Sequence, residues 1–142
     1  MSTEQDYNRR WIFWLKIFLI LAAVVFILLA AFFVFKVHSE GRFALREAKN
    51  IKLAMLTSDI EQYGVGKSIY MPERHNGLSD AAMLAIERYA GVDDGVTLLS
   101  YDRKSREVKM FTYRTLHYLV TYTYDGERED WTVDYLWRIF VY

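Results

Sequence analysis

Cysteine is absent from the 142-residue chain, and proline occurs once. Without cysteine the chain has neither a disulfide framework nor a thiolate metal site, so packing alone must stabilise the fold. The one proline is Pro72, and therefore no proline interrupts a helix between Met1 and Met71. The formal net charge is zero, with 18 Lys and Arg against 18 Asp and Glu, which gives no electrostatic reason to expect a nucleic-acid partner.

A long apolar segment lies near the amino terminus. Residues 17–35 are 19 consecutive apolar residues, and Trp11 to Leu15 extend the run on the other side of Lys16. At about 1.5 Å per residue, this length covers the roughly 30 Å of hydrocarbon in a bilayer. We therefore expect a short tail over residues 1–10 and a transmembrane helix over residues 11–37.

A cleavable signal peptide is the alternative, because the sequence from Val37 to Ser39 has the small-residue spacing that a signal peptidase accepts. The apolar core of a signal peptide is usually about 7 to 15 residues, however, and this run is longer. Trp11 and Trp14 lie where an aromatic belt would form, and Lys16 can extend towards the headgroups. These features favour a retained anchor.

The orientation of the anchor does not follow from charge, because basic residues flank the apolar run on both sides. A short tail followed by a long domain is typical of a signal anchor. We therefore expect a cell-membrane protein with a cytoplasmic amino terminus and an extracytoplasmic carboxy-terminal domain.

An amphipathic helical pattern follows the apolar run directly. Between residues 38 and 63 the apolar residues recur at intervals of three and four, as expected for one stripe on a helix; they are Ala44, Leu45, Ala48, Ile51, Met55, Leu56, Ile60 and Tyr63. Gly64 is a suitable helix terminator, and Gly41 alone could loosen the junction. The pattern predicts one continuous helix that leaves the membrane and ends at Tyr63.

The remaining segment, residues 64–142, changes from a helical period to a period of two. A loop around Pro72 precedes a short helix between Ser79 and Gly91. Four segments rich in β-branched and aromatic residues then read as strands: GVTLLSY, EVKMFTYR, HYLVTYTY and WTVDYLWRIFVY. Short connections favour an antiparallel meander, with the helix of residues 38–63 as its cover. The expected fold is α+β, in which residues 38–142 form one soluble domain.

Alternation along the last strand predicts which side chains are buried. Trp131, Val133, Tyr135, Trp137, Ile139 and Val141 form the face expected to pack on the helix. The opposite face of the sheet would be unusually apolar, and would imply a partner, if it carried Phe111, Tyr113, Leu119, Leu136 and Phe140.

No arrangement of residues typical of catalysis is apparent. His38, His75 and His117 fall in three different segments without ligand-like spacing, and no serine lies in a nucleophile-elbow context. The sequence therefore predicts no catalytic, cofactor-binding or metal-binding residues, and an enzyme is the least favoured reading.

This architecture resembles a type IV pilin or the related pseudopilin of type II secretion. In those families a long amino-terminal helix lies half in the membrane and half on a carboxy-terminal antiparallel sheet. The stretch ALREAKNIKLAMLTSDIEQYG is similar to the outer half of such a helix. No glycine precedes the apolar run, however, and Lys16 stands in place of the glutamate that pilins carry near its start.

The resemblance implies a bacterial, non-enzymatic structural or assembly subunit of a pilus or secretion apparatus. Its partners would be the lipid bilayer, other membrane or pilin-like subunits, and further copies of itself. Some pseudopilins bind Ca²⁺ in a loop of the sheet, and the acidic residues here are Asp93, Asp94, Glu127, Glu129 and Asp130. Neither the pair Asp93–Asp94 nor the group Glu127, Glu129 and Asp130 has the spacing of an EF-hand, so charged surface turns are expected. The alternative function is a membrane-tethered, extracytoplasmic ligand- or protein-binding module.

Overall fold

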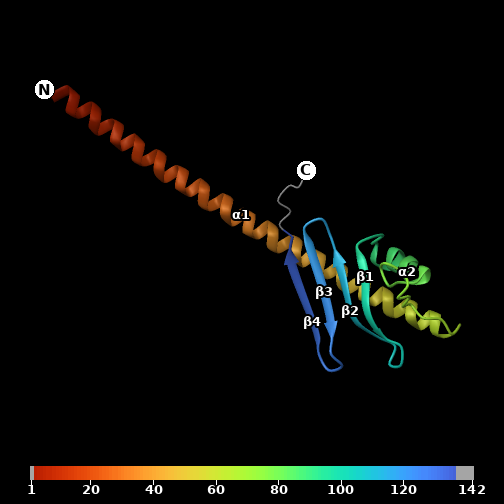
Figure 1. Cartoon of the computed structure of the whole chain (residues 1–142). Helices are drawn as coiled ribbons and strands as arrows, with labels where there is room; N and C mark the ends of the chain where they lie inside the picture. The colour runs from red at the N-terminus through yellow and green to blue at the C-terminus, as the bar shows by residue number, and fades with distance from the viewer. Residues whose placement is uncertain (1, 137–142) are drawn as a thin grey trace. The chain divides into compact units, whose positions relative to one another are not determined.

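The computed structural model describes residues 2–136, with side chains from Arg10 onward (Figure 1). It contains two helices and a four-stranded sheet: α1 (Ser2–Tyr63), α2 (Asp80–Ala90), β1 (Val96–Asp102), β2 (Glu107–Arg114), β3 (Tyr118–Tyr124) and β4 (Glu129–Tyr135). The α+β prediction is confirmed, because the long amino-terminal helix packs on an antiparallel sheet. The predicted strand positions Trp137, Ile139, Val141 and Phe140 lie outside the described residues. The chain divides into two compact units after Ser39.

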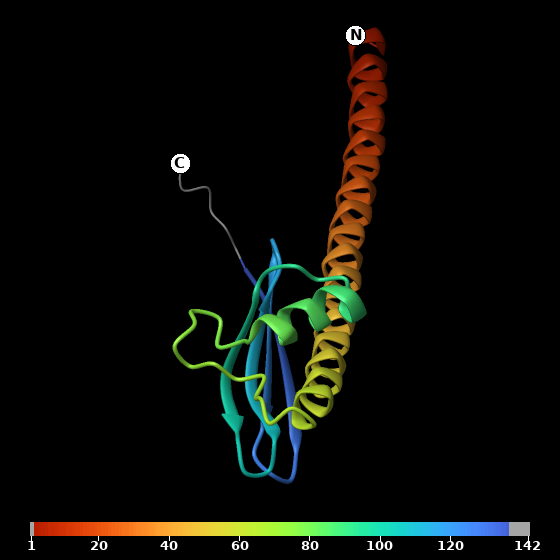
Figure 2. The same ribbon diagram turned by 90° about the vertical axis from the view of Figure 1, so that its right-hand side faces the viewer.

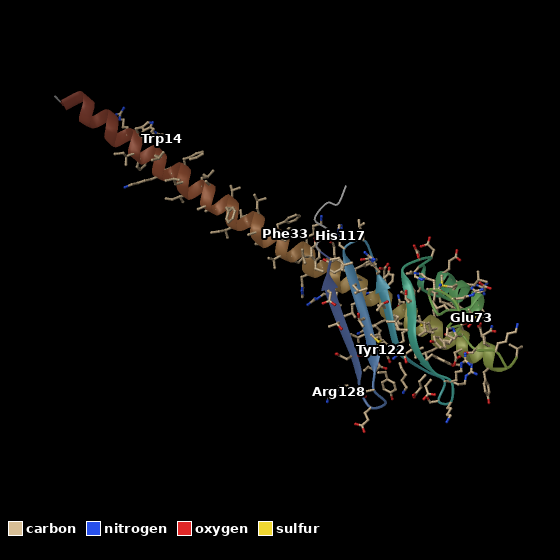
Figure 3. The ribbon with its side chains drawn as sticks, viewed as in Figure 1. Trp14, Phe33, Glu73, His117, Tyr122 and Arg128 are labelled. Carbon is tan, nitrogen blue, oxygen red and sulfur yellow. The ribbon has the colours of Figure 1, made fainter. Side chains whose placement is uncertain are left out.

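The first unit is the apolar part of α1. Its large side chains project outward from the helix, as Trp14 and Phe33 do in Figure 3. The most apolar 18-residue window has a mean hydropathy of 3.3, and none of it is buried. Among residues 2–136 this is the one helix long and apolar enough to cross a membrane, which is compatible with a single-pass anchor.

The second unit begins at Glu40 and contains the rest of α1, α2 and the sheet. The strands follow the chain in the order β1-β2-β3-β4, and each pairs antiparallel with the next, as predicted for a meander. Figure 2 shows the sheet nearly edge-on, with α1 along one side of it. In Figure 1 the strands β2 to β4 lie in front of α1, so this view is towards the uncovered face.

The buried stripe of α1 is largely the predicted one. Ala44, Ala48, Ile51 and Met55 are each at most 2% exposed. Small residues bring the helix close to the sheet: a Cβ added at Gly41 would lie 3.4 Å from the ring of Tyr118.

The predicted stripe is wrong at its distal end, because Ile60 is 75% exposed and Tyr63 is 68% exposed. Ile60 follows Ile51 by nine residues, which is two and a half turns at about 3.6 residues per turn, so it points away from the sheet. The polar side chains of Ser58 and Asp59 are buried instead.

The sheet buries the face that alternation on β4 predicted. Trp131, Val133 and Tyr135 pack against the core from β4. Phe111 and Tyr113 do not contribute to an apolar outer face, as was considered above. They are buried on the side of the sheet that packs on α1, where they are 0% and 6% exposed. Their strand partners there are Tyr122 and Val120, so the pleat directs these side chains inward together.

The short helix α2 has the predicted ends. The Ser79 side chain accepts a hydrogen bond from the backbone N–H of Ala82, and Gly91 ends the helix with a positive φ of 70°. Ala82 and Ile86 join the same core as α1 and the sheet. The loop before α2 runs along β1, where the Leu98 N–H donates to the carbonyl of Asn76 at 2.8 Å. This bond covers part of one sheet edge.

Candidate interaction surfaces

The histidines and acidic turns do not form a metal site in the part of the chain that the structure describes, where no group of three His, Cys, Asp or Glu residues could hold an ion. His38 lies on α1, His75 lies in the loop before α2, and His117 stacks near the ring of Tyr135. As Figure 3 shows, His117 lies at the opposite end of the sheet from Arg128.

The acidic residues considered for cation binding have partners within the fold. The Asp94 carboxylate accepts from the N–H of Gly95, and Glu129 accepts from the Lys52 ammonium on α1. In the same turn as Glu127, Asp125 accepts from the N–H groups of Glu127 and Arg128 at 2.8 Å each. These two backbone donors hold the pKa of Asp125 below its usual range. Asp94 and Asp125 therefore have a role in turn formation.

A buried polar cluster joins the last turns of α1 to the β1–β2 turn. Asp59 accepts two hydrogen bonds from the guanidinium of Arg106, and a third from the Tyr101 hydroxyl at 2.8 Å. Burial, reinforced by the bond to Asp59, raises the pKa of Tyr101 to about 12. Sequence reasoning missed this cluster, because its members lie in a charged turn and on a helix that reads as simply amphipathic.

Two further polar contacts fasten α1 across the sheet. The Lys52 ammonium bonds to Glu129 and lies 4.6 Å from the ring centroid of Tyr122. The Tyr113 hydroxyl donates to Glu47 at 3.0 Å. Burial, and then this bond, raise the pKa of Tyr113. Every buried side-chain polar atom in the described residues has a partner, so these groups support the fold.

The outer surface of α1 carries basic residues followed by apolar ones. Arg42, Arg46 and Lys49 are exposed in its first turns beyond Ser39. Leu53 and Ile60 follow at seven-residue spacing and are 62% and 75% exposed. Because α1 buries its opposite side on the sheet, this outer surface is exposed within the described second unit, apart from the Lys49 ammonium, which lies 5.9 Å from the ring centroid of Trp131.

The outer face of the sheet is a row of hydroxyl groups. Thr97, Thr112, Thr121 and Thr132 are paired in register across all four strands. The neighbouring row contains Ser100, Met110, Thr123 and Asp130, and these four line a shallow hollow of about 610 Å³. Along β4 the outer side chains are Asp130, Thr132 and Asp134, all exposed. Lys109 and Arg128 line the same hollow. This face is therefore polar, with exposed carboxylates on β4 and two basic residues at the hollow.

Comparisons of the chain with known protein families, with curated proteins and with solved structures found no match. No activity, substrate or partner is therefore carried over from a relative. The surfaces available for function are the apolar anchor, the outer side of α1 and the bare face of the sheet.

Proposed function

We propose that this chain is a non-enzymatic, membrane-anchored subunit with pilin-like architecture, which serves a structural or assembly role in a bacterial pilus or secretion apparatus. Its amino terminus lies in the cytoplasm, and the domain of residues 40–142 lies outside. The anchor places the chain among other membrane subunits, and the domain contacts its neighbours.

One observation carries this proposal: α1 is a single helix from Ser2 to Tyr63. Its apolar run exposes large apolar side chains on all sides, whereas beyond Ser39 the helix buries one side and exposes the other. A helix that is apolar all round needs a bilayer or other helices around it. The same helix is also the spine of the domain, since its inner side forms the core with the sheet.

The polar chemistry of the domain supports a structural role. Among the described residues the buried carboxylate is Asp59, and it accepts hydrogen bonds from Arg106 and Tyr101 within the fold. A catalytic carboxylate, by contrast, must reach a substrate in a cleft.

Self-association of the intact protein tests the proposal. The full chain is purified in mild detergent, transferred to lipid nanodiscs and weighed by light scattering and native mass spectrometry. We expect assemblies of two or more copies, or copies bound to another membrane subunit that co-purifies. A strictly monomeric protein with no bound subunit would contradict the proposal.

The polar outer face of the sheet favours one alternative, a membrane-tethered module that binds a ligand or protein. The hydroxyl row and the hollow beside it offer many hydrogen-bonding groups. This alternative predicts a monomer whose ligand binding is lost when Thr112 and Thr121 are replaced by lysine. The mass measurement distinguishes the two proposals, because a binding module is expected to be a monomer and an assembly subunit is expected to associate.

A further inference from the structure

Two faces of the second unit lack the layer that would complete them. The sheet has α1 on one side, and among the described residues no helix covers its other side, where the loop before α2 projects beyond β1 (Figures 1 and 2). The helix has the sheet on one side, and its outer side exposes Leu53 and Ile60. Stable domains usually bury such faces between layers. If a second copy is stacked on the first along the normal of the sheet, the helix of one copy covers the open face of the other copy's sheet. The same contact covers the outer side of that helix.

The two faces carry opposite charge. The outer side of α1 presents Arg42, Arg46 and Lys49, whereas the outer side of β4 presents Asp130 and Asp134. Among residues 10–136 none of these five side chains takes part in an ion pair within the chain, where the paired cations are Lys52, Arg74, Arg106 and Lys109. The charges of Arg42, Arg46, Asp130 and Asp134 are therefore available to a neighbouring molecule, whereas the exposed Lys49 also lies 5.9 Å from the ring centroid of Trp131 in its own chain.

The opposite charges also stand at matching heights along α1. A Cβ at Gly41 would lie 3.8 Å from Val133, and the Lys49 ammonium lies 5.9 Å from the ring centroid of Trp131. Helix side chains lean towards the amino terminus. The Arg42 head is thus level with Asp134, the residue after Val133, and the Lys49 head is level with Asp130.

The apolar residues correspond in the same way at the distal end. Asp59 accepts a hydrogen bond from Tyr101, so the next helix residue, Ile60, is level with the end of β1. Leu99 lies there, beside the β-bulge, and is 47% exposed. A helix that packs on the outer face would bring Ile60 close to Leu99. The small threonine side chains of that face would let the helix approach the sheet closely.

We propose that the outer side of α1 in one copy packs on the bare outer face of the sheet in the next copy, with Arg42 facing Asp134 and Lys49 facing Asp130. Copies inserted in one bilayer run in the same direction, as a contact that repeats by translation requires. The contact is heterologous, so it repeats into a row or a ring. The inference deepens the proposed function and rests on it.

A two-fold contact between the outer sides of two α1 helices fits less well. Chains anchored in the same direction would place Arg42, Arg46 and Lys49 against the same cations of the partner, and facing like charges are unfavourable. On the sheet face the cation in the row of Asp134 is Arg114, two strands away. That separation is about 10 Å at the usual strand spacing.

Cysteine cross-linking tests the contact directly, since the chain has no cysteine of its own. Full-length Arg42→Cys and Asp134→Cys chains, carrying tags of different size, are reconstituted together in nanodiscs and oxidised. We expect a disulfide-linked heterodimer from the mixture and little product from either chain alone. The matched control pairs Arg42→Cys with Glu87→Cys, an exposed position on α2, and should not cross-link.

Charge reversal supplies the second arm. Arg42→Glu with Lys49→Glu, or Asp130→Lys with Asp134→Lys, should each weaken self-association about tenfold or more, and a mixture of the two double variants should restore it. A wild type that is monomeric and carries no other subunit overturns both this contact and the proposed function, whereas a single copy bound to a different subunit overturns the contact alone. Assemblies that persist without the cross-link, that link Arg42→Cys to itself, or that ignore the reversals overturn the contact alone. The contact alone is also overturned if Arg42→Glu with Lys49→Glu changes binding to anionic vesicles and leaves self-association unchanged.

Discussion

Arg106 and Asp59 are joined by three hydrogen bonds: Nε to Oδ2 at 3.1 Å, Nη2 to Oδ1 at 2.7 Å, and Nη2 to the Asp59 carbonyl at 2.7 Å. They connect the last turns of α1 to the turn between β1 and β2. Arg106 adopts a positive φ of 55°, which costs a non-glycine residue about 1 kcal/mol or more. The contacts with Asp59 offset that cost.

Replacing Asp59 by alanine should therefore lower the free energy of unfolding by about 2 to 3 kcal/mol, the usual range for hydrogen bonds to a charged group. The buried carboxylate is lost, and Arg106 and Tyr101 lose their common acceptor. Denaturant unfolding of the full chain in detergent, followed by near-ultraviolet circular dichroism, measures the change. Glu61→Ala is the control on the same helix, because Glu61 is exposed. Equal stability of the two variants would contradict the assignment.

Stability should fall in alkali through the buried tyrosines. The pKa of Tyr101 is raised to about 12 by burial and by its bond to Asp59, above the ordinary value of 10.0. A raised folded-state pKa stabilises the fold fully below pH 10, and this contribution is lost as the pH rises through about 12. Tyr101→Phe should show a shallower loss of stability between pH 10 and 12.

The measurement compares denaturation midpoints of wild type and Tyr101→Phe across that interval. Some slope should remain in the variant, because burial and the bond to Glu47 also raise the pKa of Tyr113. Two parallel curves would show that Tyr101 titrates alike in the folded and unfolded chains.

Gly77 should tolerate no side chain. Its φ is +68°, and a Cβ there would collide with the carbonyl oxygen of Leu98 on β1. Gly77→Ala should destabilise the fold by at least about 2 kcal/mol more than Gly66→Ala. Gly66 is a matched control, since its φ is also +68° but nothing lies within 4 Å of an added Cβ. Thermal unfolding of both variants in detergent checks the difference, and equal losses would contradict the close approach.

Much of this fold follows from periodicity in the sequence. The helix to Tyr63, the caps Ser79 and Gly91, and the meander each depend on contacts that are close in sequence or on one repeating pattern. The buried side of β4 was predictable for the same reason.

The errors arise where tertiary contacts override local pattern. Hydropathy assigns Ile60 to the core and Asp59 to solvent, but Arg106, 47 residues later in the chain, supplies the partner that lets Asp59 be buried. The register that aligns Thr97 with Thr112 depends on turn geometry and on the irregularities in the β1–β2 pairing. The surfaces proposed for assembly became visible only once that register was known.

The apolar part of α1 should fail to anchor when it carries a central charge. Leu28→Arg introduces a cation near the middle of the run, at a cost of roughly 2.5 to 3.5 kcal/mol for insertion. We expect the variant to be extracted from membranes by alkaline carbonate, whereas wild type stays in the pellet. Lys36→Arg is the control, as it keeps the charge at the edge of the run. Retention of Leu28→Arg in the pellet would argue against a single span here.

Labelling of single cysteines should establish which side of the membrane the domain occupies. Charge does not decide it, because Arg9, Arg10 and Lys16 precede the apolar run and Lys36 and Arg42 follow it. We expect Lys104→Cys, exposed in the β1–β2 turn, to react with an impermeant maleimide on intact cells.

In the same experiment Thr3→Cys should react only after the cells are made permeable, since the proposed orientation puts the amino-terminal tail in the cytoplasm. The parent chain has no cysteine, so each signal reports one position. Labelling of Thr3→Cys but not Lys104→Cys on intact cells would reverse the proposed orientation. The domain would then face the cytoplasm, where it could not contribute to an extracellular fibre, although the contact between α1 and a neighbouring sheet would still be open to test.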